Sequence, residues 1–237
     1  MGHPLGRLAL LHPFPSALNA AVVAALATVA GGEPGDAALA AIAMLGFQVS
    51  IGALNDLVDV EADQAAQPWK PIPAGRVSKA AARAVTFTAA SLGVVASLLV
   101  DPLLVAIGVA GYACGVAYDL DLKRRGLGWV AIAAAFPLLL LFGWTAGGGG
   151  LPPGWPVLLP LAAIAGPALH LANAMADLDP DTRGNPRSAV VRLGHRRAAA
   201  LLTLLTVAVQ LLAWSIITSL ASDPVPLALA VASTALA

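Results

Sequence analysis

The sequence predicts an all-α fold, a polytopic bundle of about eight transmembrane helices, from three observations. First, 59% of the 237 residues are hydrophobic and only 11% are charged, whereas a soluble domain is about 45–50% apolar and about 25% charged. Second, the apolar residues form runs close to the roughly 20 residues that a membrane helix needs. Third, every Lys and Arg lies at the N-terminus, in alternate connections between the runs, or in the first turn of the run that follows such a connection. This composition excludes a soluble enzyme, a nucleic-acid-binding protein and a disordered chain.

Eight apolar runs are the expected spans. They lie at 13–30, 37–57, 80–100, 102–118, 128–146, 155–176, 197–220 and, as a short eighth, 224–237. A strand interpretation fails because the runs are long and do not alternate between polar and apolar residues. The first run resembles a signal peptide, since Arg7 precedes an Ala-rich stretch, but polytopic proteins usually retain such a span. We expect one membrane-embedded domain over residues 1–237.

The charges predict the orientation of these spans. The basic residues are Arg7, Lys70, Arg76, Lys79, Arg83, Lys123, Arg124, Arg125, Arg183, Arg187, Arg192, Arg196 and Arg197. The remaining connections carry only the acidic residues Glu33, Asp36, Asp101 and Asp223. By the positive-inside rule, the N-terminus and loops 58–79, 119–127 and 177–196 are cytoplasmic. The expected location is a bacterial inner (plasma) membrane.

An acidic motif occurs twice, each time at the predicted cytoplasmic end of a span. In each copy an Asn is followed by an Asp four residues later and by another Asp after four more. The copies are Asn55, Asp59 and Asp63 in the first half and Asn173, Asp177 and Asp181 in the second. Internal repeats are common in membrane folds, so this repetition predicts two similar four-helix halves.

The spacing of the motif indicates a metal site. Residues four apart share one helix face, so each copy forms an oxygen-bearing stripe, with Asp56 beside the first. The like charges repel one another unless a cation lies between them. A set of oxygen ligands without His or Cys favours Mg²⁺ over zinc. Substrate phosphates commonly complete the coordination shell of Mg²⁺. Nearby Lys and Arg side chains then bind the other phosphate oxygens. Two other interpretations stay open: solvated acids at helix ends, and a proton or cation relay in a transporter.

At these residues the chain resembles the UbiA superfamily of intramembrane prenyltransferases. The family's first motif, N-D-x-x-D-x-x-x-D, is matched by Asn55, Asp56, Asp59 and Asp63. The family's second motif, D-x-x-x-D, is matched by Asp177 and Asp181, and Asn173 precedes it as in the family. The loop after the first motif has the family's Pro-x-x-x-Gly turn and carries Lys70 and Arg76. Two further matches are Tyr118 with the nearby Lys123, and the segment Val191 to Gly194. The resemblance covers about residues 10–220.

The resemblance implies a helix bundle around a central cavity open to the lipid, with an active site near the cytoplasmic face. Two Mg²⁺ ions would hold an isoprenyl diphosphate, and loss of diphosphate would leave an allylic cation that an aromatic or lipid-like acceptor attacks. The implied metal ligands are Asp56, Asp59, Asp63, Asp177 and Asp181. The implied diphosphate contacts are Asn55, Lys70, Arg76, Tyr118, Lys123 and Asn173. The residues expected to be catalytic are Asp59, Asp177 and Lys123. No nucleic acid and no obligate protein partner is expected beside membrane lipid.

The chain departs from the family pattern in two places. Members usually have nine spans, whereas only 14 residues follow Asp223, so the chain is either a shortened member or part of a longer one. Pro180 stands where many members have Gly. A membrane terpene cyclase would share the diphosphate ionisation, and a secondary transporter is a further alternative. A CDP-alcohol phosphotransferase is disfavoured because its D-G-x-x-A-R core is absent.

We expect structural roles for three polar residues outside the motifs. His12 opens the first span and is expected to begin a helix at the membrane interface, with an acceptor contact as the alternative. Asp119 and Asp121 are expected to pair with the basic residues 123–125 rather than to form a third metal motif.

Overall fold

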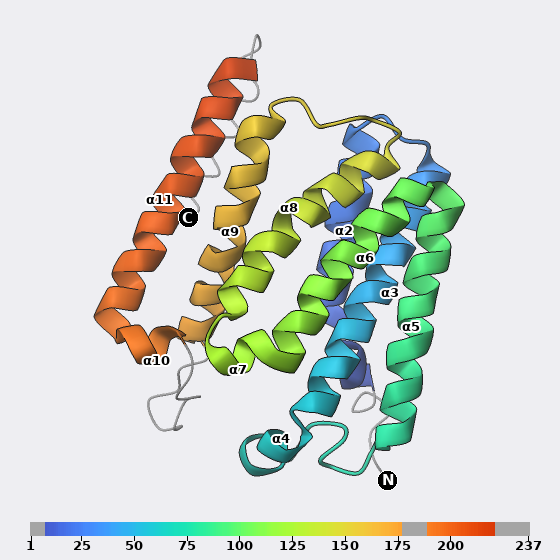
Figure 1. The fold of residues 1–237 in the computed structure, drawn as a ribbon, viewed down its shortest axis with the longest axis vertical. Helices are drawn as coiled ribbons and strands as arrows, with labels where there is room; N and C mark the ends of the chain where they lie inside the picture. The colour runs from blue at the N-terminus through green and yellow to red at the C-terminus, as the bar shows by residue number, and fades with distance from the viewer. Residues whose placement is uncertain (1–7, 177–188, 221–237) are drawn as a thin grey trace. The chain divides into compact units, whose positions relative to one another are not determined.

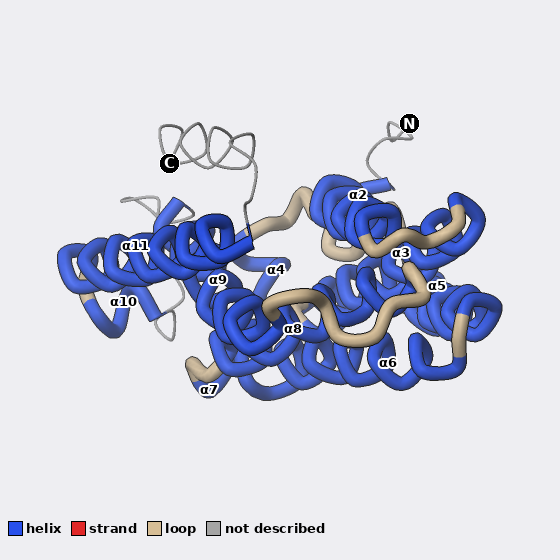
Figure 2. Tube along the Cα trace, turned by 90° about the horizontal axis from the view of Figure 1, so that it is seen from above, coloured by secondary structure: helices blue, strands red, loops and turns tan. Residues whose placement is uncertain are grey.

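The structure, a computed structural model, describes residues 8–176 and 189–220. Within this part of the chain only helices and connecting loops occur, as Figures 1 and 2 show. The elements are η1 (Ala9–Leu11), α2 (Pro13–Val29), α3 (Pro34–Val58), α4 (Val60–Ala66), α5 (Lys79–Val100), α6 (Pro102–Ala117), the π-helix η2 (Tyr118–Leu122), α7 (Lys123–Arg125), α8 (Gly128–Ala146), α9 (Trp155–Ala176), α10 (Ala189–Leu193) and α11 (His195–Leu220).

Seven of the described helices are long and apolar enough to cross a membrane. They coincide with the first seven predicted runs, so the all-α, multi-pass prediction is confirmed. The eighth run, 224–237, lies outside the described residues. Local sequence signals fix the helix starts: prolines occupy the first turns of α2, α3 and α6, where the missing N–H costs no helical hydrogen bond. The Ser78 and Asp101 side chains accept hydrogen bonds from the first turns of α5 and α6.

Residues 1–122 and 138–152 form one compact unit, the first unit. Its central element is α3, which packs against α2, α5 and α6. The core is built around Phe47 of α3, whose ring lies 5.7 Å from that of Tyr112 and 6.4 Å, edge-on, from that of Phe142. Phe142 belongs to the second part of α8, which explains why this part groups with the first unit.

Small and hydroxyl side chains let these helices approach closely. A Cβ atom added to Gly46 of α3 would lie 2.7 Å from the Ala89 carbonyl oxygen of α5, so only glycine fits at this crossing. The hydroxyl of Ser50 donates to the Thr86 carbonyl at 2.7 Å and lies 2.9 Å from the Tyr112 hydroxyl. Such close packing and interhelical hydrogen bonds stabilise helix association in lipid.

Contacts at one end of the first unit bring three segments together. The start of α2 contacts the end of α3 through His12 and Asp56, and the end of α3 contacts η2 through Asn55 and Asp119. The N-terminal segment and the loops after the second and fourth spans therefore share one end, as the charge pattern predicts. Which side of the membrane this end faces stays a prediction.

Residues 123–137 and 153–237 form the second unit. Within it α9 packs against α11 and α10, around Leu171, Val190 and Ala198. Gly166 of α9 lies against Phe136 in the first part of α8. Helix α8 is shared between the two units. That the chain consists of two similar four-helix halves stays a prediction.

Candidate active site

The first acidic motif lies where α3 ends and α4 begins. Helix α3 ends at Val58, Asp59 adopts φ −90° and ψ 3°, and α4 starts at Val60. The Asp59 N–H donates to Asn55 O at 2.9 Å, and the Asp63 N–H donates to Asp59 O at 2.8 Å. The expectation that one helix face carries Asn55, Asp59 and Asp63 therefore needs correction. Asn55 lies on α3, Asp63 lies on α4 and Asp59 lies at the junction, and backbone hydrogen bonds keep the four-residue spacing across it.

The loop after α4 folds back toward this motif. The Arg76 and Val77 N–H groups both donate to the Pro71 carbonyl, and Gly75 supplies the left-handed φ of 69° that this turn requires. Ile72 is buried in a small core with residues of α3, α4 and α5. The guanidinium of Arg76 donates to the Trp69 carbonyl at 2.6 Å. These contacts fix the position of Lys70 in the same loop.

Lys70 lies between two carboxylates of the motif. Its Nζ is 2.8 Å from Asp63 Oδ2 and 3.3 Å from Asp56 Oδ1. The Asp56 and Asp63 side chains are only 3% and 8% exposed. Asp56 is near the end of α3 and Asp63 is in α4, on either side of the junction at Asp59. The pair that converges on a single cation is therefore Asp56 with Asp63, whereas the sequence prediction placed Asp56 beside the stripe.

The charge state of Lys70 follows from these contacts. Burial alone would lower the pKa of the ammonium, but the hydrogen bond to Asp63 and the negative charges of Asp56 and Asp63 outweigh burial and raise its pKa above the ordinary value. Lys70 is therefore fully charged at neutral pH, and it neutralises part of the negative charge at the end of α3.

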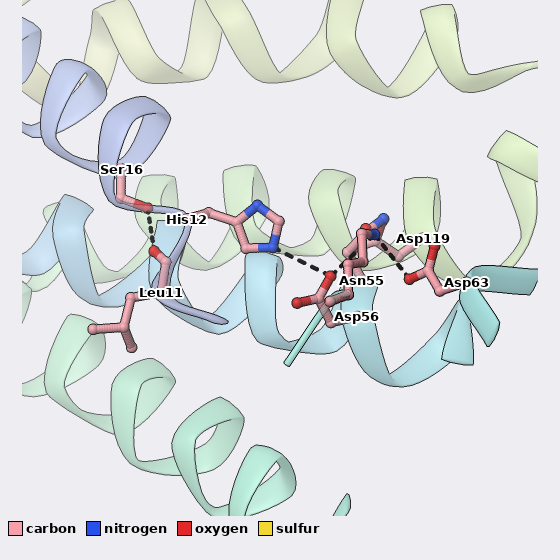
Figure 3. Close-up of polar contacts among 8 residues, drawn as sticks. Leu11, His12, Ser16, Asn55, Asp56, Asp63 and Asp119 are labelled. Atoms are coloured by element: carbon pink, nitrogen blue, oxygen red, sulfur yellow. Dashed lines mark hydrogen bonds and ion pairs between the residues drawn. The ribbon is translucent and has the colours of Figure 1, made fainter. Parts of the chain in front are cut away.

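Asn55 is held by a residue that the sequence prediction assigned elsewhere. Its Nδ2 donates to Asp119 Oδ1 at 2.7 Å, and Asp119 is 2% exposed (Figure 3). The sequence interpretation placed Asp119 in a cytoplasmic loop, paired with the basic residues 123–125. It lies instead in the π-helix that follows α6. Such π segments occur often at functional sites. The pattern of apolar residues in the sequence did not predict this one.

His12 is a second residue near the motif that the sequence did not assign to the site. Its Nε2 lies 3.4 Å from Asp56 Oδ1. Asp56 thus faces two basic side chains, Lys70 and His12. The only hint in the sequence was the alternative of an acceptor contact for His12.

The remaining predicted site residues are distributed over both units. Asp59 and Tyr118 are half-buried in the first unit, at the α3–α4 junction and at the start of η2. Lys123 begins α7 in the second unit, where Asn173 is exposed on α9. Asp177 and Asp181 lie outside the described residues. The convergence of the two acidic motifs on one substrate stays a prediction.

The donor set of the first motif fits an oxygen-liganded cation. Two nearly buried carboxylates already share one positive charge, that of Lys70, and hard oxygen donors are those that Mg²⁺ prefers. Within residues 8–176 and 189–220, no three His, Cys, Asp or Glu side chains come together as a ready metal site. A bound Mg²⁺ would therefore need further oxygen ligands, from the second motif or from a phosphate.

Comparison with known proteins decides the family. Residues 16–237 match the sequence profile of the UbiA prenyltransferase family. The chain belongs to this family. The predicted resemblance and the prenyltransferase class are thereby confirmed.

Several relatives of this UbiA-family protein share one name. It is 31% identical over 196 residues to the digeranylgeranylglyceryl phosphate synthase of Natronomonas pharaonis, covering 81% of this chain and 70% of the relative. It is 34% identical over 148 residues to the synthase of the same name from Methanoculleus marisnigri. That match covers 61% of this chain and 52% of the relative, so the chain spans about half of the latter's length.

Solved structures show the same fold. A UbiA homologue from Archaeoglobus fulgidus bound to DMAPP and Mg²⁺ superposes with a TM-score of 0.80 at 16% identity, covering 97% of this chain and 86% of the homologue. The apo structure of a homologue from Aeropyrum pernix gives a TM-score of 0.71 at 19% identity, covering 93% and 82%. This UbiA-family protein is accordingly an integral, multi-pass membrane protein.

Proposed function

We propose that this protein is a Mg²⁺-dependent intramembrane prenyltransferase that moves an isoprenyl group from a prenyl diphosphate to a lipid acceptor. The observation that carries the proposal is the pair Asp56 and Asp63, held nearly buried at the end of a membrane helix and already sharing one cation. Buried carboxylates at the end of a span are costly, and such groups are usually functional.

The residues of the first unit suit the departure of a diphosphate. In the proposed reaction the bond between the prenyl carbon and the diphosphate oxygen breaks, the acceptor oxygen bonds to that carbon, and the acceptor proton leaves. Mg²⁺, when bound, would neutralise the charge that develops on the leaving diphosphate. Asp56 and Asp63 would hold this ion, with Asp59 beside them. Lys70 would then turn its ammonium from the carboxylates to the phosphate oxygens.

The second unit is proposed to supply the other half of the site. Asp177 and Asp181 would hold a second Mg²⁺, and Asn173 one turn earlier would contact the diphosphate. Lys123 and Tyr118, from segments adjacent in the chain, would bind phosphate oxygens as charge builds on them. The support for this step is the repeated motif in the sequence and the family assignment. The site is proposed to face the cytoplasm, where all the Lys and Arg residues are predicted to lie.

The acceptor is proposed to be a lipid that carries a glyceryl phosphate. The relatives named above are called digeranylgeranylglyceryl phosphate synthases, and that product name describes a glyceryl phosphate bearing two geranylgeranyl groups. Such an acceptor could reach a site within the bilayer from the lipid phase. An aromatic acceptor is the alternative.

Incubation of the purified protein in lipid nanodiscs tests the proposal. Geranylgeranyl diphosphate is supplied with geranylgeranylglyceryl phosphate or with 4-hydroxybenzoate, in Mg²⁺ or in chelator, and products are identified by mass spectrometry. Mg²⁺-dependent formation of a doubly prenylated glyceryl phosphate is expected. Prenylated 4-hydroxybenzoate as the main product would replace the lipid acceptor with an aromatic one.

Two results would overturn the transferase proposal itself. Consumption of the diphosphate without any acceptor, with release of a hydrocarbon, would identify a terpene cyclase. Failure to consume any prenyl diphosphate, together with ion-coupled uptake of a solute into proteoliposomes, would identify a transporter.

A further inference from the structure

His12 reaches the most buried carboxylate of the first motif from outside the motif. Its Nε2 lies 3.4 Å from Asp56 Oδ1, and Figure 3 shows its ring projecting from the start of α2 toward this carboxylate on α3. Both atoms are shielded from solvent, and within the described chain neither has a partner in hydrogen-bonding geometry. A buried polar atom without a partner is destabilising. The polar groups nearest this Asp56 oxygen are the His12 Nε2 and the Lys70 ammonium, which lies 3.3 Å from it.

The backbone around His12 is held in an unusual conformation. Its φ of 44° and ψ of 58° are left-handed, and among the described non-glycine residues only His12 has a positive φ. Its N–H donates to the Ala9 carbonyl, and its carbonyl accepts from the Ser16 N–H. The Ser16 hydroxyl, which is buried, donates to the Leu11 carbonyl at 3.1 Å. Strained backbone of this kind persists where the surroundings fix it, and it concentrates at functional sites.

Gly52 makes room for the His12 ring. A Cβ atom added to Gly52 would lie 2.6 Å from His12 Cδ2 and 2.9 Å from Cγ, closer than real side-chain carbons come. Gly52 is in the interior of α3, where glycine destabilises a helix relative to alanine. The gain that offsets this cost is the close approach of the imidazole to Asp56, one helical turn further along α3.

We propose that His12 is a positioning residue that fixes the orientation of the Asp56 carboxylate for the metal and diphosphate, and that Gly52 is required for its approach. This inference rests on the proposed function. A side chain that orients a metal-binding carboxylate commonly changes metal affinity or activity by about 10- to 100-fold when it is removed. His12 would act on the site from the residue before α2, whereas the residues of the motif itself lie on α3, on α4 or at the junction between them.

Three variants of the protein test this role by its effect on metal affinity. His12→Ala removes the contact, and Gly52→Ala displaces the ring without altering it. His12→Gln restores a donor of similar reach. We expect the Mg²⁺ concentration for half-maximal turnover to rise about tenfold or more in His12→Ala and Gly52→Ala. In His12→Gln this concentration should lie between that of His12→Ala and that of the wild-type protein. Gly35→Ala is the matched control, because Gly35 is also in α3 and its added Cβ would meet no atom within 4 Å.

A binding measurement separates this proposal from the proposed function. Thermal unfolding is followed in nanodiscs with inorganic pyrophosphate while Mg²⁺ is titrated. We expect the Mg²⁺ midpoint for stabilisation to rise about tenfold in His12→Ala and Gly52→Ala but not in Gly35→Ala. Unchanged midpoints in both of the first two variants would overturn the positioning role. If the wild-type protein transfers no prenyl group while the midpoints still shift, the proposed function fails and the role of His12 stands.

Discussion

Replacement of Lys70 by methionine tests whether the two carboxylates of the first motif are built around a cation. Lys70→Met keeps the length of the side chain and removes its charge. It leaves Asp56 and Asp63, only 3% and 8% exposed, facing each other without the ammonium. Removal of one partner from a buried ion pair costs about 3–5 kcal/mol. Because the Lys70 side chain is 20% exposed and lies in a loop that can admit water, we expect the lower end of this range, about 3 kcal/mol.

The assay is thermal unfolding of the protein in nanodiscs, first in chelator and then with Mg²⁺. For a chain of this length about 3 kcal/mol corresponds to a fall in Tm of roughly 6–12 °C. Mg²⁺ at about 100 times its Kd contributes about 2.7 kcal/mol. Mg²⁺ should therefore return most of the lost Tm in Lys70→Met. Mg²⁺ should stabilise the wild-type protein less, because in the wild-type site it must first displace the Lys70 ammonium.

The pH dependence of this loss has a definite sign. The pKa of Lys70 in the folded protein is raised above the ordinary 10.5 by Asp63 and Asp56, despite the opposing effect of burial. Its contribution to stability is therefore fully present below pH 10.5 and is lost only as the pH rises through the higher folded pKa. Between about pH 7 and 9 the Tm difference contributed by the Lys70 charge should stay constant.

Lys79→Met is the control, because Lys79 begins α5 and is exposed. Its Tm should stay close to that of the wild-type protein. The reasoning is refuted if Lys70→Met unfolds at the wild-type temperature in chelator, or if Mg²⁺ raises the Tm of both proteins equally.

Three further predictions concern the motif residues and the orientation. Asn55→Ala and Asp119→Ala should each lower the free energy of unfolding by about 1.5–3 kcal/mol, because each removes one partner of the hydrogen bond between Asn55 and the charged Asp119 carboxylate; their double variant should lose less than the sum, by thermal unfolding. Asp177→Asn should lower kcat by at least about 100-fold at an unchanged Tm, if it holds a metal that stabilises the leaving group; near-wild-type turnover would exclude it from the site. Cysteines placed at Gly35 and Arg76, in a background without the native cysteine, should react with an impermeant reagent from outside only at Gly35, and the reverse pattern would invert the predicted topology.

The span positions could be predicted closely because they depend on local properties of the sequence. Runs of apolar residues set the length of each helix, and prolines at the first turns of α2, α3 and α6 mark where three of them begin. The grouping of the N-terminus with alternate loops at one end of the first unit was also predictable, because charge alone sets it. None of these inferences requires knowledge of which side chains touch.

The contacts of the site could not be predicted, because each depends on a tertiary arrangement. Lys70 reaches Asp56 and Asp63 only because the loop from Gln67 to Ser78 folds back on the end of α3. The Asp119 carboxylate meets Asn55 because a π-helix interrupts the regular spacing after α6. A sequence pattern with a period of 3.6 residues contains no signal for either event.

The contacts around the first motif combine two requirements that oppose each other. Carboxylates at the end of a membrane helix must be shielded from water to bind a diphosphate-bound cation tightly. Shielding, however, raises the free energy of the ionised carboxylates, because they lose their hydration. The first unit meets both requirements by bringing one polar group from each of three segments to the same place. His12 from the start of α2 and Lys70 from the loop after α4 face Asp56, and Asp119 from η2 accepts from Asn55. The same contacts hold the helix ends together. The interactions of the motif with these three side chains therefore stabilise the end of the unit at which substrate is proposed to bind. A substitution of His12 should therefore lower thermal stability and metal affinity together. A substitution of Lys70 should lower thermal stability without lowering metal affinity, because it removes the ammonium that Mg²⁺ must displace.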